Sequence, residues 1–402
     1  MHWIMSVTVT LLAPLVLISY YVGRKLFKAT TLRFSWNHKR TRWMTIAAYG
    51  YMHLLPILFA LSFFVGGRGV TLAFTGENRW VDFFIVYPFW VTLVVNIQAA
   101  LLFSLTDLSK LVFRKFYKAS RDRWRDVESK TVLTVFGFIL AYSVITISFN
   151  TWTVRLSEKV IALPSQFAGL DGLRIAQISD VQGDGRTTEE DLRDYVKRVN
   201  DLHPDLILFG GDIVTSGEKY IESTAAILGE LRAKYGIYAA VGDHDIFSNR
   251  TRVVYALTSN GIQVIEDSSI VLQTEKGPIE ITGITYTYRQ RPDEASLAKA
   301  MNGNSAVYRI LLCHQPAEPL VRVASQRGYN LYVAGHTHGG GLAFGIPGLF
   351  LVAPASFESR YVSGLYHNDN LQVSVTNGLG LTLAPIRFNA PAEITLLTLV
   401  KK

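Results

Sequence analysis

Four long apolar stretches in the first 150 residues constrain this chain more than any other feature. They cover residues 5–22, 44–65, 83–105 and 132–149, and each is close to the roughly 20 residues that a helix needs to cross a bilayer. Core helices of a soluble domain would show a polar face at helical spacing, whereas these stretches are apolar almost all round. We therefore predict four transmembrane helices. Three of them contain a proline (Pro14, Pro56 and Pro88), which helix bundles tolerate.

The basic residues between these stretches indicate their orientation. The segment between the first two holds seven lysines and arginines and no acidic residue, and eight more basic residues lie between the last two. The segment between the second and third stretches holds only two basic residues, Arg68 and Arg79. By the positive-inside rule, the two basic segments face the cytoplasm. We therefore expect both ends of the bundle, and the C-terminal half of the chain, outside the cytoplasm.

The net charge of +8 comes from the flanks of the apolar stretches. Residues 1–150 hold 17 basic and 6 acidic residues, a net charge of +11, and the remainder holds 23 and 26, a net charge of −3. Basic residues beside a span can bind anionic lipid heads, so they do not indicate nucleic acid. We predict membrane lipids and no nucleic acid as partners. We also predict two domains, a transmembrane domain at residues 1–150 and a second domain at residues 151–402.

The second half alternates short apolar runs with amphipathic segments, which is typical of an α/β domain. Strands are predicted at residues 173–178, 206–209, 237–241, 308–312 and 331–333. A capping box of Thr187 and Glu190 predicts the start of one helix, and a second helix is expected over residues 221–234. Each predicted strand is followed by aspartate or histidine; these residues are Asp180, Asp212, Asp243, His244, Asp245, His314, His336 and His338.

Five clusters of acidic and imidazole side chains at strand ends indicate a shared binding site. In open α/β sheets, ligands bind beyond the carboxyl ends of the strands, where loops direct side chains into one crevice. A single aspartate there would be interpreted as a helix cap or a turn residue. Carboxylate and imidazole donors together suit Mn, Fe or Zn better than Ca. Two such ions about 3.5–4 Å apart can clamp a phosphoryl group and lower the pKa of a water between them.

The motifs ISD at 178–180, GGD at 210–212, GDHD at 242–245, CH at 313–314 and GHTH at 335–338 occur in that order. Together they resemble the calcineurin-like metallophosphoesterases, from about residue 154 to the end. The tail resembles that of the membrane-associated bacterial branch of this family in Pro385, Arg387, Phe388, Pro391 and Glu393. The resemblance implies a four-layer α/β/β/α sandwich, two bound divalent ions and the hydrolysis of phosphoric esters.

The resemblance also implies roles for individual residues. The implied ligands are Asp180 and His338 for the first metal ion, His314 and His336 for the second, and Asp212 between the two. His244 would donate a proton to the leaving oxygen, as suits a histidine outside the ligand set. Asp245 would orient that histidine or a nearby loop.

The chain departs from the family pattern at two ligand positions. Gln182 stands where a first-metal histidine is expected, and its amide oxygen is a weaker ligand for Zn or Fe than imidazole is, which favours Mn or Mg. Asp243 stands in place of a second-metal asparagine and adds a carboxylate that strengthens the second site. Asp184, between two glycines, is either a turn residue or a substitute ligand. Arg186 is either a surface residue or a ligand for a substrate phosphate.

The predicted function is a membrane-anchored enzyme that hydrolyses a phosphoester or pyrophosphate bond, for which a lipid-linked substrate is attractive. We place its catalytic domain on the extracytoplasmic side of a bacterial inner membrane. Two divalent ions are the expected cofactors, with Mn preferred over Fe, Zn or Mg. The altered first site leaves an alternative, a metal-binding receptor or regulatory protein that has lost turnover. Transport or sensing by the spans is disfavoured, because they contain almost no charge.

Overall fold

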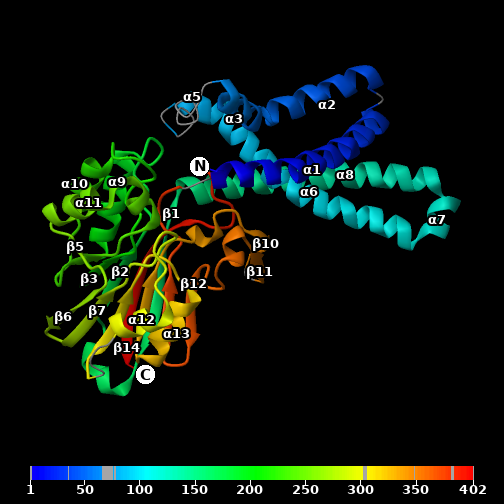
Figure 1. Ribbon diagram of the computed structural model, residues 1–402. Helices are drawn as coiled ribbons and strands as arrows, with labels where there is room; N and C mark the ends of the chain where they lie inside the picture. The colour runs from blue at the N-terminus through cyan, green and yellow to red at the C-terminus, as the bar shows by residue number, and fades with distance from the viewer. Residues whose placement is uncertain are drawn as a thin grey trace. The chain divides into compact units, whose positions relative to one another are not determined.

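The computed structural model describes residues 2–34, 36–65, 76, 78–301, 306–347, 349–381 and 384–401 (Figure 1). The chain divides into two compact units, Met1–Ser148 and Phe149–Lys402. The first unit is helical and the second combines helices with two large sheets. Each unit is described by itself below.

Among the described residues, two helical stretches are long and apolar enough to cross a membrane, and the second of them continues from the helical unit into the start of the other unit. They are Arg79–Val112 and Arg121–Trp152, and they include the expected spans at residues 83–105 and 132–149. The elements of the helical unit are α1 (His2–Phe34), α2 (His38–Met52), α3 (Leu54–Val65), α5 (Arg79–Val81), the π-helical turn η1 (Asp82–Val86), α6 (Tyr87–Val112), α7 (Arg114–Ala119) and α8 (Arg121–Trp152).

The other two expected spans are not confirmed by the described residues. The expected span 44–65 is divided between α2 and α3, and His53 forms the break. Pro56 has no amide hydrogen for the carbonyl of Met52, and its ring would collide with that carbonyl, so α2 ends at Met52. The expected span 5–22 lies in α1, and half of its side chains, those of residues 5–13, fall outside the described residues.

Charged side chains of the helical unit meet at the ends of the expected spans. Lys25 of α1 lies 2.5 Å from Asp107 of α6 and 2.7 Å from Glu128 of α8. Lys110 contacts the same two carboxylates at 2.9 and 2.5 Å. All four residues lie outside the apolar stretches themselves, so this network joins three helices without placing charge within an expected span.

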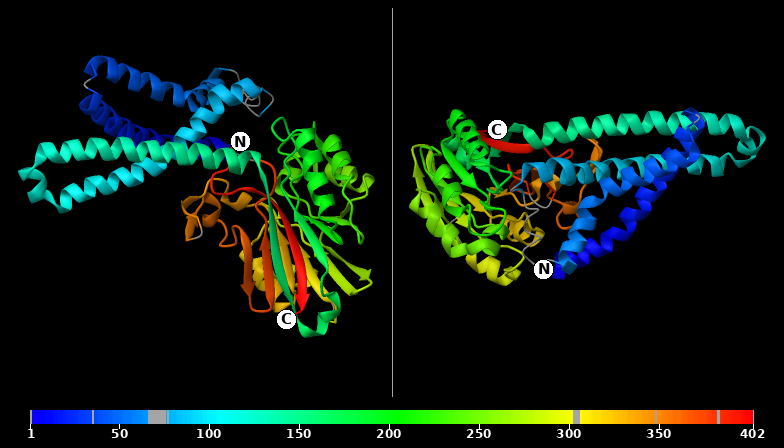
Figure 2. Two further views of the ribbon diagram at one scale, coloured as in Figure 1. Left: turned by 180° about the vertical axis from the view of Figure 1, so that it is seen from behind. Right: turned by 90° about the horizontal axis from the view of Figure 1, so that it is seen from above.

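The second unit is a sandwich of two six-stranded sheets, which Figures 1 and 2 show face to face. The first sheet has the order β1 (Val154–Leu163), β14 (Ala392–Lys401), β2 (Arg174–Ile178), β3 (Leu206–Phe209), β4 (Ile237–Ala239), β5 (Gln263–Val264). The second has the order β12 (Gly364–Asn368), β13 (Leu371–Val375), β9 (Leu331–Ala334), β8 (Tyr308–Leu312), β7 (Gly277–Gly283), β6 (Ser268–Thr274). A separate hairpin pairs β10 (Phe344–Ile346) with β11 (Phe350–Val352).

Helices cover the outer face of each sheet. The α-helices are α9 (Glu189–Asp201), α10 (Ile221–Leu228), α11 (Asp243–Ser259), α12 (Glu294–Ala300) and α13 (Glu318–Gln326), and the 3₁₀ turns are η2 (Ser165–Leu170), η3 (His338–Gly340) and η4 (Pro354–Phe357). One buried cluster joins α9, α10 and α11 to the first sheet, a second fills the space between the sheets, and a third joins α12 and α13 to the second sheet. The expected α/β/β/α layering is thus confirmed.

Parallel pairing brings the predicted site residues to one edge of the sandwich. Strands β2, β3 and β4 are parallel neighbours, and so are β7, β8 and β9 in the other sheet. Gly335 allows the two sheets to approach each other there, because a Cβ atom on it would lie 2.0 Å from Ser179 Oγ and 2.3 Å from Asp180 Oδ2. The predicted strand ends therefore face one another across the sandwich.

Two helix boundaries differ from those predicted. Thr188 and Asp191, rather than Thr187 and Glu190, form the capping box of α9. The amide of Thr187 is already bonded to the Asp184 carboxylate in the preceding turn, so the helix begins one residue later. The helix expected over residues 221–234 ends at Leu228, and Gly229 follows as its C-cap.

Candidate metal centre

The loops that follow the strands hold their polar residues in an unusual backbone conformation. Nine described residues other than glycine have a positive φ angle, and five of them are predicted ligands: Asp180, Gln182, Asp212, His336 and His338, with φ between 50° and 70°. Left-handed backbone is uncommon for such residues and is associated with functional sites. These loops therefore hold their side chains in place at a local energetic cost.

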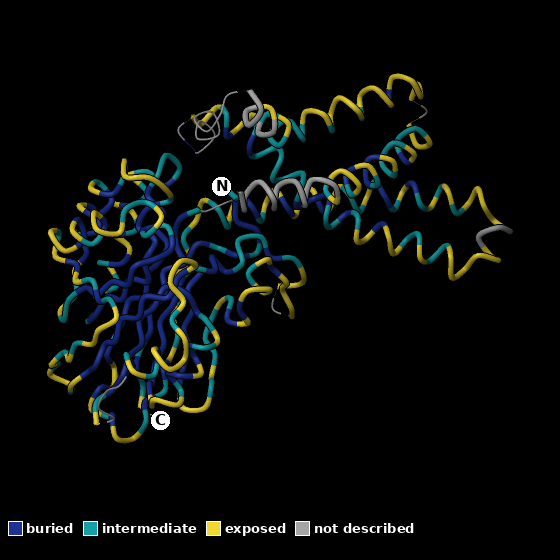
Figure 3. The backbone as a smooth tube through the Cα atoms, viewed as in Figure 1, coloured by how far each residue is buried: buried dark blue, intermediate teal, exposed yellow. Residues whose placement is uncertain are grey.

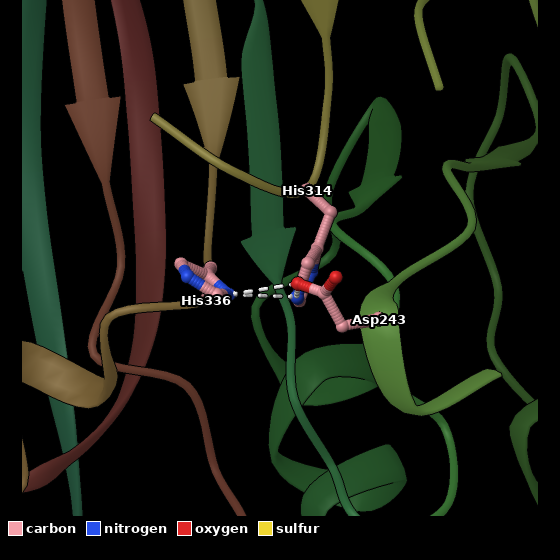
Figure 4. A group of neighbouring side chains, drawn as sticks. All are labelled: Asp243, His314 and His336. Atoms are coloured by element: carbon pink, nitrogen blue, oxygen red, sulfur yellow. Dashed lines mark hydrogen bonds and ion pairs between the residues drawn. The ribbon is translucent and has the colours of Figure 1, made fainter. Parts of the chain in front are cut away.

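The predicted ligands of the second ion lie close together. The donor atoms of Asp243, His314 and His336 all lie within 4.8 Å of one another. His336 Nδ1 is 3.2 Å from Asp243 Oδ2 and 3.2 Å from His314 Nε2, as the dashed lines in Figure 4 show. His314 Nε2 is also 3.2 Å from Asp212 Oδ2. Side chains from both sheets thus converge on one point.

Neighbouring groups orient each of these three ligands. His314 Nδ1 donates to the carbonyl of Gly210 at 2.7 Å, which leaves Nε2 as the ring atom that faces the aspartates. His336 Nε2 lies 3.6 Å from the Glu358 carboxylate, so Nδ1 is the atom that faces Asp243. Asp243 Oδ2 accepts from Gln315 Nε2 at 2.7 Å. A hydrogen-bonded neighbour that fixes the tautomer of a histidine is typical of metal ligands.

Asp212 lies between the two groups of predicted ligands. Its Oδ1 accepts from the backbone amide of His244 at 2.8 Å, and its Oδ2 accepts from Gln182 Nε2 at 3.1 Å. The Asp245 carboxylate is fully buried and accepts from the amides of Gly242, Asp212 and Ile213. Of the two roles expected for Asp245, these contacts favour orientation of the loop that carries Asp212.

His244 lies at the start of α11 and is partly exposed. Its Nδ1 contacts the carbonyl oxygen of Thr215. Because a carbonyl can only accept, Nδ1 must carry a hydrogen. Nε2 is therefore the ring atom that remains for proton exchange.

The predicted ligands of the first ion are arranged less favourably. The donor atoms of Asp180, Asp212 and His314 form a compact group, and His338 Nε2 lies 3.4 Å from Asp180 Oδ1. Arg387 Nη2 lies 3.3 Å from His338 Nδ1, and a guanidinium can only donate. Nδ1 must then accept, and the imidazole hydrogen resides on Nε2. A metal ligand at Nε2 would need the opposite tautomer.

Burial and charge shift the proton affinities of this cluster. Burial alone would raise the pKa of Asp212, but His314 and His244 lower it below its usual value. Burial opposes protonation of His336, yet the carboxylates of Asp243 and Glu358 raise its pKa to about 9. Burial lowers the pKa of His338 to about 4. A proton on His336 therefore offsets only part of the carboxylate charge here, and a divalent cation would displace it.

The donor set fits divalent cations. Asp180, Asp212 and Asp243 are at most 2% exposed, and several uncompensated carboxylates in a protein interior are costly. Among the described residues, Asp180 Oδ1 and Gln182 Oε1 are buried oxygen atoms without a hydrogen-bond partner. Oxygen atoms in this state, next to imidazole nitrogens, are suitable ligands for Mn²⁺ or Mg²⁺.

Two other sequence candidates, Asp184 and Arg186, and the single cysteine have defined surroundings. The Asp184 carboxylate accepts from the amides of Arg186 and Thr187 and from the hydroxyl of Thr215, as a turn residue does. Arg186 therefore lies in the same turn as Asp184, to whose carboxylate its backbone amide donates a hydrogen bond. Cys313 is buried, which raises its pKa to about 12, and it packs in the core of the second sheet.

Several residues that contact the predicted site have no sequence signal of their own. Among them are Tyr288, Gln315, Glu358 and Arg387, the last of which was noted only as part of the tail. Tyr288 donates through its hydroxyl to Glu358 at 2.7 Å and through its backbone amide to Asp243 at 2.7 Å. Gln315 directly follows His314, and this position beside a predicted ligand was a usable signal. Tyr288 and Glu358 follow no predicted strand, so no local pattern identified them.

Two facing sheets with carboxylate and imidazole donors at their strand ends define a site suited to divalent metal ions. The calcineurin-like phosphoesterase family model matches residues 173–340. The chain is 33% identical over 236 residues to the metallophosphoesterase YkuE of Bacillus subtilis, an alignment that covers 58% of this chain and 80% of that protein. The chain belongs to the calcineurin-like metallophosphoesterase family, and it is a phosphoric ester hydrolase.

Two further relatives differ in how much of each chain they match. A Helicobacter pylori metallophosphoesterase is 29% identical over 235 residues, which cover 57% of this chain and 60% of that protein. A Danio rerio protein named transmembrane protein with metallophosphoesterase domain is 29% identical over 334 residues, which cover 77% of this chain and 73% of that protein. The match to the Danio rerio protein covers 77% of this chain, whereas residues 149–402 make up less than two thirds of it. This match therefore extends into the helical unit. Together with the two apolar stretches, it indicates membrane association.

Proposed function

We propose that this protein is a membrane-anchored phosphoesterase that hydrolyses a phosphoester or pyrophosphate bond of a lipid-linked substrate with two divalent metal ions. The observation that carries the proposal is the convergence of Asp212, Asp243, His314 and His336 from two sheets, with donor atoms 3.2–3.6 Å apart. Divalent ions bound there would supply charge for the phosphoryl oxygens and activate a water molecule. The chain itself holds, orients and protonates the reacting groups.

Each site residue has a proposed task. The ligands of the first ion are Asp180, Gln182, Asp212 and His338, and those of the second are Asp212, Asp243, His314 and His336. His244 gives a proton from Nε2 to the leaving oxygen, while the Thr215 carbonyl holds its ring. Asp245 keeps the Asp212 loop in place through the three hydrogen bonds that its carboxylate accepts from backbone amides. Arg186 is assigned to a phosphate oxygen of the substrate.

A second candidate function is a metal-binding regulatory protein without turnover. It is favoured by the first-ion site, where Gln182 donates its amide to Asp212 and Arg387 lies beside His338. Hydrolysis of a chromogenic aryl phosphate by purified protein with added Mn²⁺ separates the two candidates. Metal binding without any turnover would support the regulatory function.

Replacing Gln182 by histidine is expected to raise the Mn²⁺ affinity of the first-ion site. Imidazole is a stronger metal ligand than an amide oxygen. Loss of a residue that only hydrogen-bonds a metal ligand already lowers metal affinity by about 10-fold or more, so the gain in Mn²⁺ affinity from a direct ligand should be at least about 10-fold. Metal analysis after dialysis against limiting Mn²⁺ should find more ions per chain in Gln182→His than in the parent. The exposed Gln326→His variant is the control for an added histidine. Equal metal content in the parent and Gln182→His would contradict a first-ion role for this position.

The proposed anchoring has four spans, at residues 5–22, 44–65, 83–105 and 132–149, with residues 151–402 as the catalytic domain outside the cytoplasm. The charge distribution of the connecting segments supports this orientation. A reporter fused after Asn150 should then show extracytoplasmic activity, and a reporter fused after Lys28 should show cytoplasmic activity. A cytoplasmic signal from the Asn150 fusion would overturn the orientation but not the hydrolase chemistry.

A further inference from the structure

The segment between His338 and Glu358 forms an apolar lobe on the catalytic unit. None of its 19 residues, 339–357, is ionisable. Its centre is the β10–β11 hairpin, which pairs with neither large sheet (Figure 1). Figure 3 colours this lobe largely as exposed. Six apolar side chains in it are between 40% and 89% exposed: Ile346, Leu349, Phe350, Leu351, Val352 and Phe357.

Both faces of this hairpin carry exposed apolar side chains, although Phe344 at its root packs against Phe388. Successive side chains of a strand point to opposite faces, and all three residues of β11 (Phe350–Val352) are exposed. An isolated two-stranded hairpin is marginal in water, and a contiguous exposed apolar patch marks an interaction surface. The hairpin therefore suits an apolar phase that surrounds it better than a partner that packs on one side.

The root of the hairpin is tied to the end of a candidate membrane span. Ala343 donates its amide to the Phe388 carbonyl and Phe388 donates its amide to the Gly341 carbonyl, both at 2.9 Å. The neighbouring amide of Arg387 donates to Thr151 Oγ1 at 2.9 Å. Thr151 lies in the last turn of α8, which is long and apolar enough to cross a membrane. Arg387 and Phe388 thus link the root of the hairpin to that helix end.

The other end of the lobe reaches the metal centre. The 3₁₀ turn η4 leads from the hairpin into Glu358. The Glu358 carboxylate accepts from the Tyr288 hydroxyl at 2.7 Å and lies 3.6 Å from His336 Nε2. One continuous segment therefore begins at His338, passes through the apolar hairpin and returns to His336.

We propose that the β10–β11 hairpin inserts into the lipid bilayer and holds the mouth of the metal centre at the bilayer surface. The occupant is lipid, because the lobe carries no charge for a protein partner and its root is bonded to the end of a membrane helix. Insertion to the depth of the headgroup and acyl boundary is typical of such interfacial elements. The inference rests on the membrane anchoring in the proposed function, but it does not depend on turnover.

Labelling at introduced cysteines tests this insertion in the full chain. Cys313 is buried and is the single native cysteine, so Leu349→Cys can be labelled with the environment-sensitive dye NBD in nanodiscs of phosphatidylethanolamine and phosphatidylglycerol. Spin-labelled lipid is expected to quench this dye by about twofold or more, and aqueous iodide to have little effect. Val352→Cys, nearer the root, should be quenched less by lipid. Glu275→Cys is the matched control, because the side chain at this β6–β7 turn is 75% exposed, and it should respond to iodide.

Each outcome decides the proposal. Iodide quenching at position 349 as strong as at position 275 would overturn it. Disulfide formation between two chains at position 349 without lipid quenching would replace lipid by a second copy and would also overturn it. Phe350→Cys repeats the measurement if Leu349→Cys does not fold. Hydrolysis of an aryl phosphate is measured on the same samples, so lipid quenching without activity would refute the proposed function and leave the hairpin inference standing.

Discussion

Replacing Asp212 by asparagine is expected to lower aryl phosphate hydrolysis with Mn²⁺ by more than about 100-fold. Loss of a residue that only hydrogen-bonds a metal ligand costs up to about 100-fold, and loss of a direct ligand should cost more. The asparagine amide would keep an oxygen for the His244 backbone amide, which the present carboxylate binds at 2.8 Å. It would lose the negative charge that lies 3.2 Å from His314. The variant should therefore fold while binding metal poorly. The rate at saturating substrate and the bound Mn²⁺ are the two measurements.

A matched control tests whether the loss comes from the site or from any missing carboxylate. Asp205 precedes β3, the strand whose carboxyl end leads to Asp212, and its carboxylate accepts from the Arg174 amide at 2.9 Å. Asp205→Asn should retain hydrolysis within a few-fold of the parent. Hydrolysis by Asp212→Asn that also stayed within a few-fold would exclude the bridging role.

Removing divalent metal by chelation is expected to abolish hydrolysis and to destabilise the catalytic unit. Asp180, Asp212 and Asp243 are buried and close together, so their mutual repulsion opposes folding when no cation is bound. Mn²⁺ at about 100 times its dissociation constant should add about 2.7 kcal/mol to the free energy of unfolding for each site. For a unit of about 250 residues, this raises the unfolding midpoint by roughly 5–10 °C.

The choice of probe matters for this measurement. All seven tryptophans lie at or before residue 152, so their fluorescence reports mainly on the helical unit. Amide hydrogen exchange in β2, β3 and β8, with and without Mn²⁺, reports on the metal centre directly. Protection should rise with Mn²⁺ in the parent and much less in Asp212→Asn. Identical exchange in the parent with and without Mn²⁺ would show that no metal is coupled to this fold.

The membrane half shows where local patterns were sufficient and where they were not. Length and composition identify two candidate spanning stretches among the described residues, because both are properties of a single segment. The expected span 44–65 has the right composition but is broken at His53 in the structure, since Pro56 ends the hydrogen-bonded helix at Met52. Hydropathy does not register the loss of one backbone hydrogen bond.

The catalytic half shows the same division at single residues. The predicted strand 173–178 and β2 (Arg174–Ile178) agree within one residue, and the predicted strands 206–209 and 308–312 agree fully with β3 and β8. The capping box was misplaced by one residue, because two overlapping threonine and acid pairs fit the same local pattern. The turn at Asp184 decided between them.

The amino-acid sequence by itself determined which residue types follow each strand, and so the chemistry of the donors, because an apolar run that ends in glycine with aspartate or histidine is a local pattern. Only the tertiary structure decided which donors meet. The packing of two sheets brings His336 within hydrogen-bond reach of Asp180, 156 positions earlier in the chain. It also adds Glu358, Tyr288 and Arg387 as partners of His336 and His338, two of the predicted ligands. Such contacts depend on how the two sheets pack against each other, and no short stretch of sequence determines that packing.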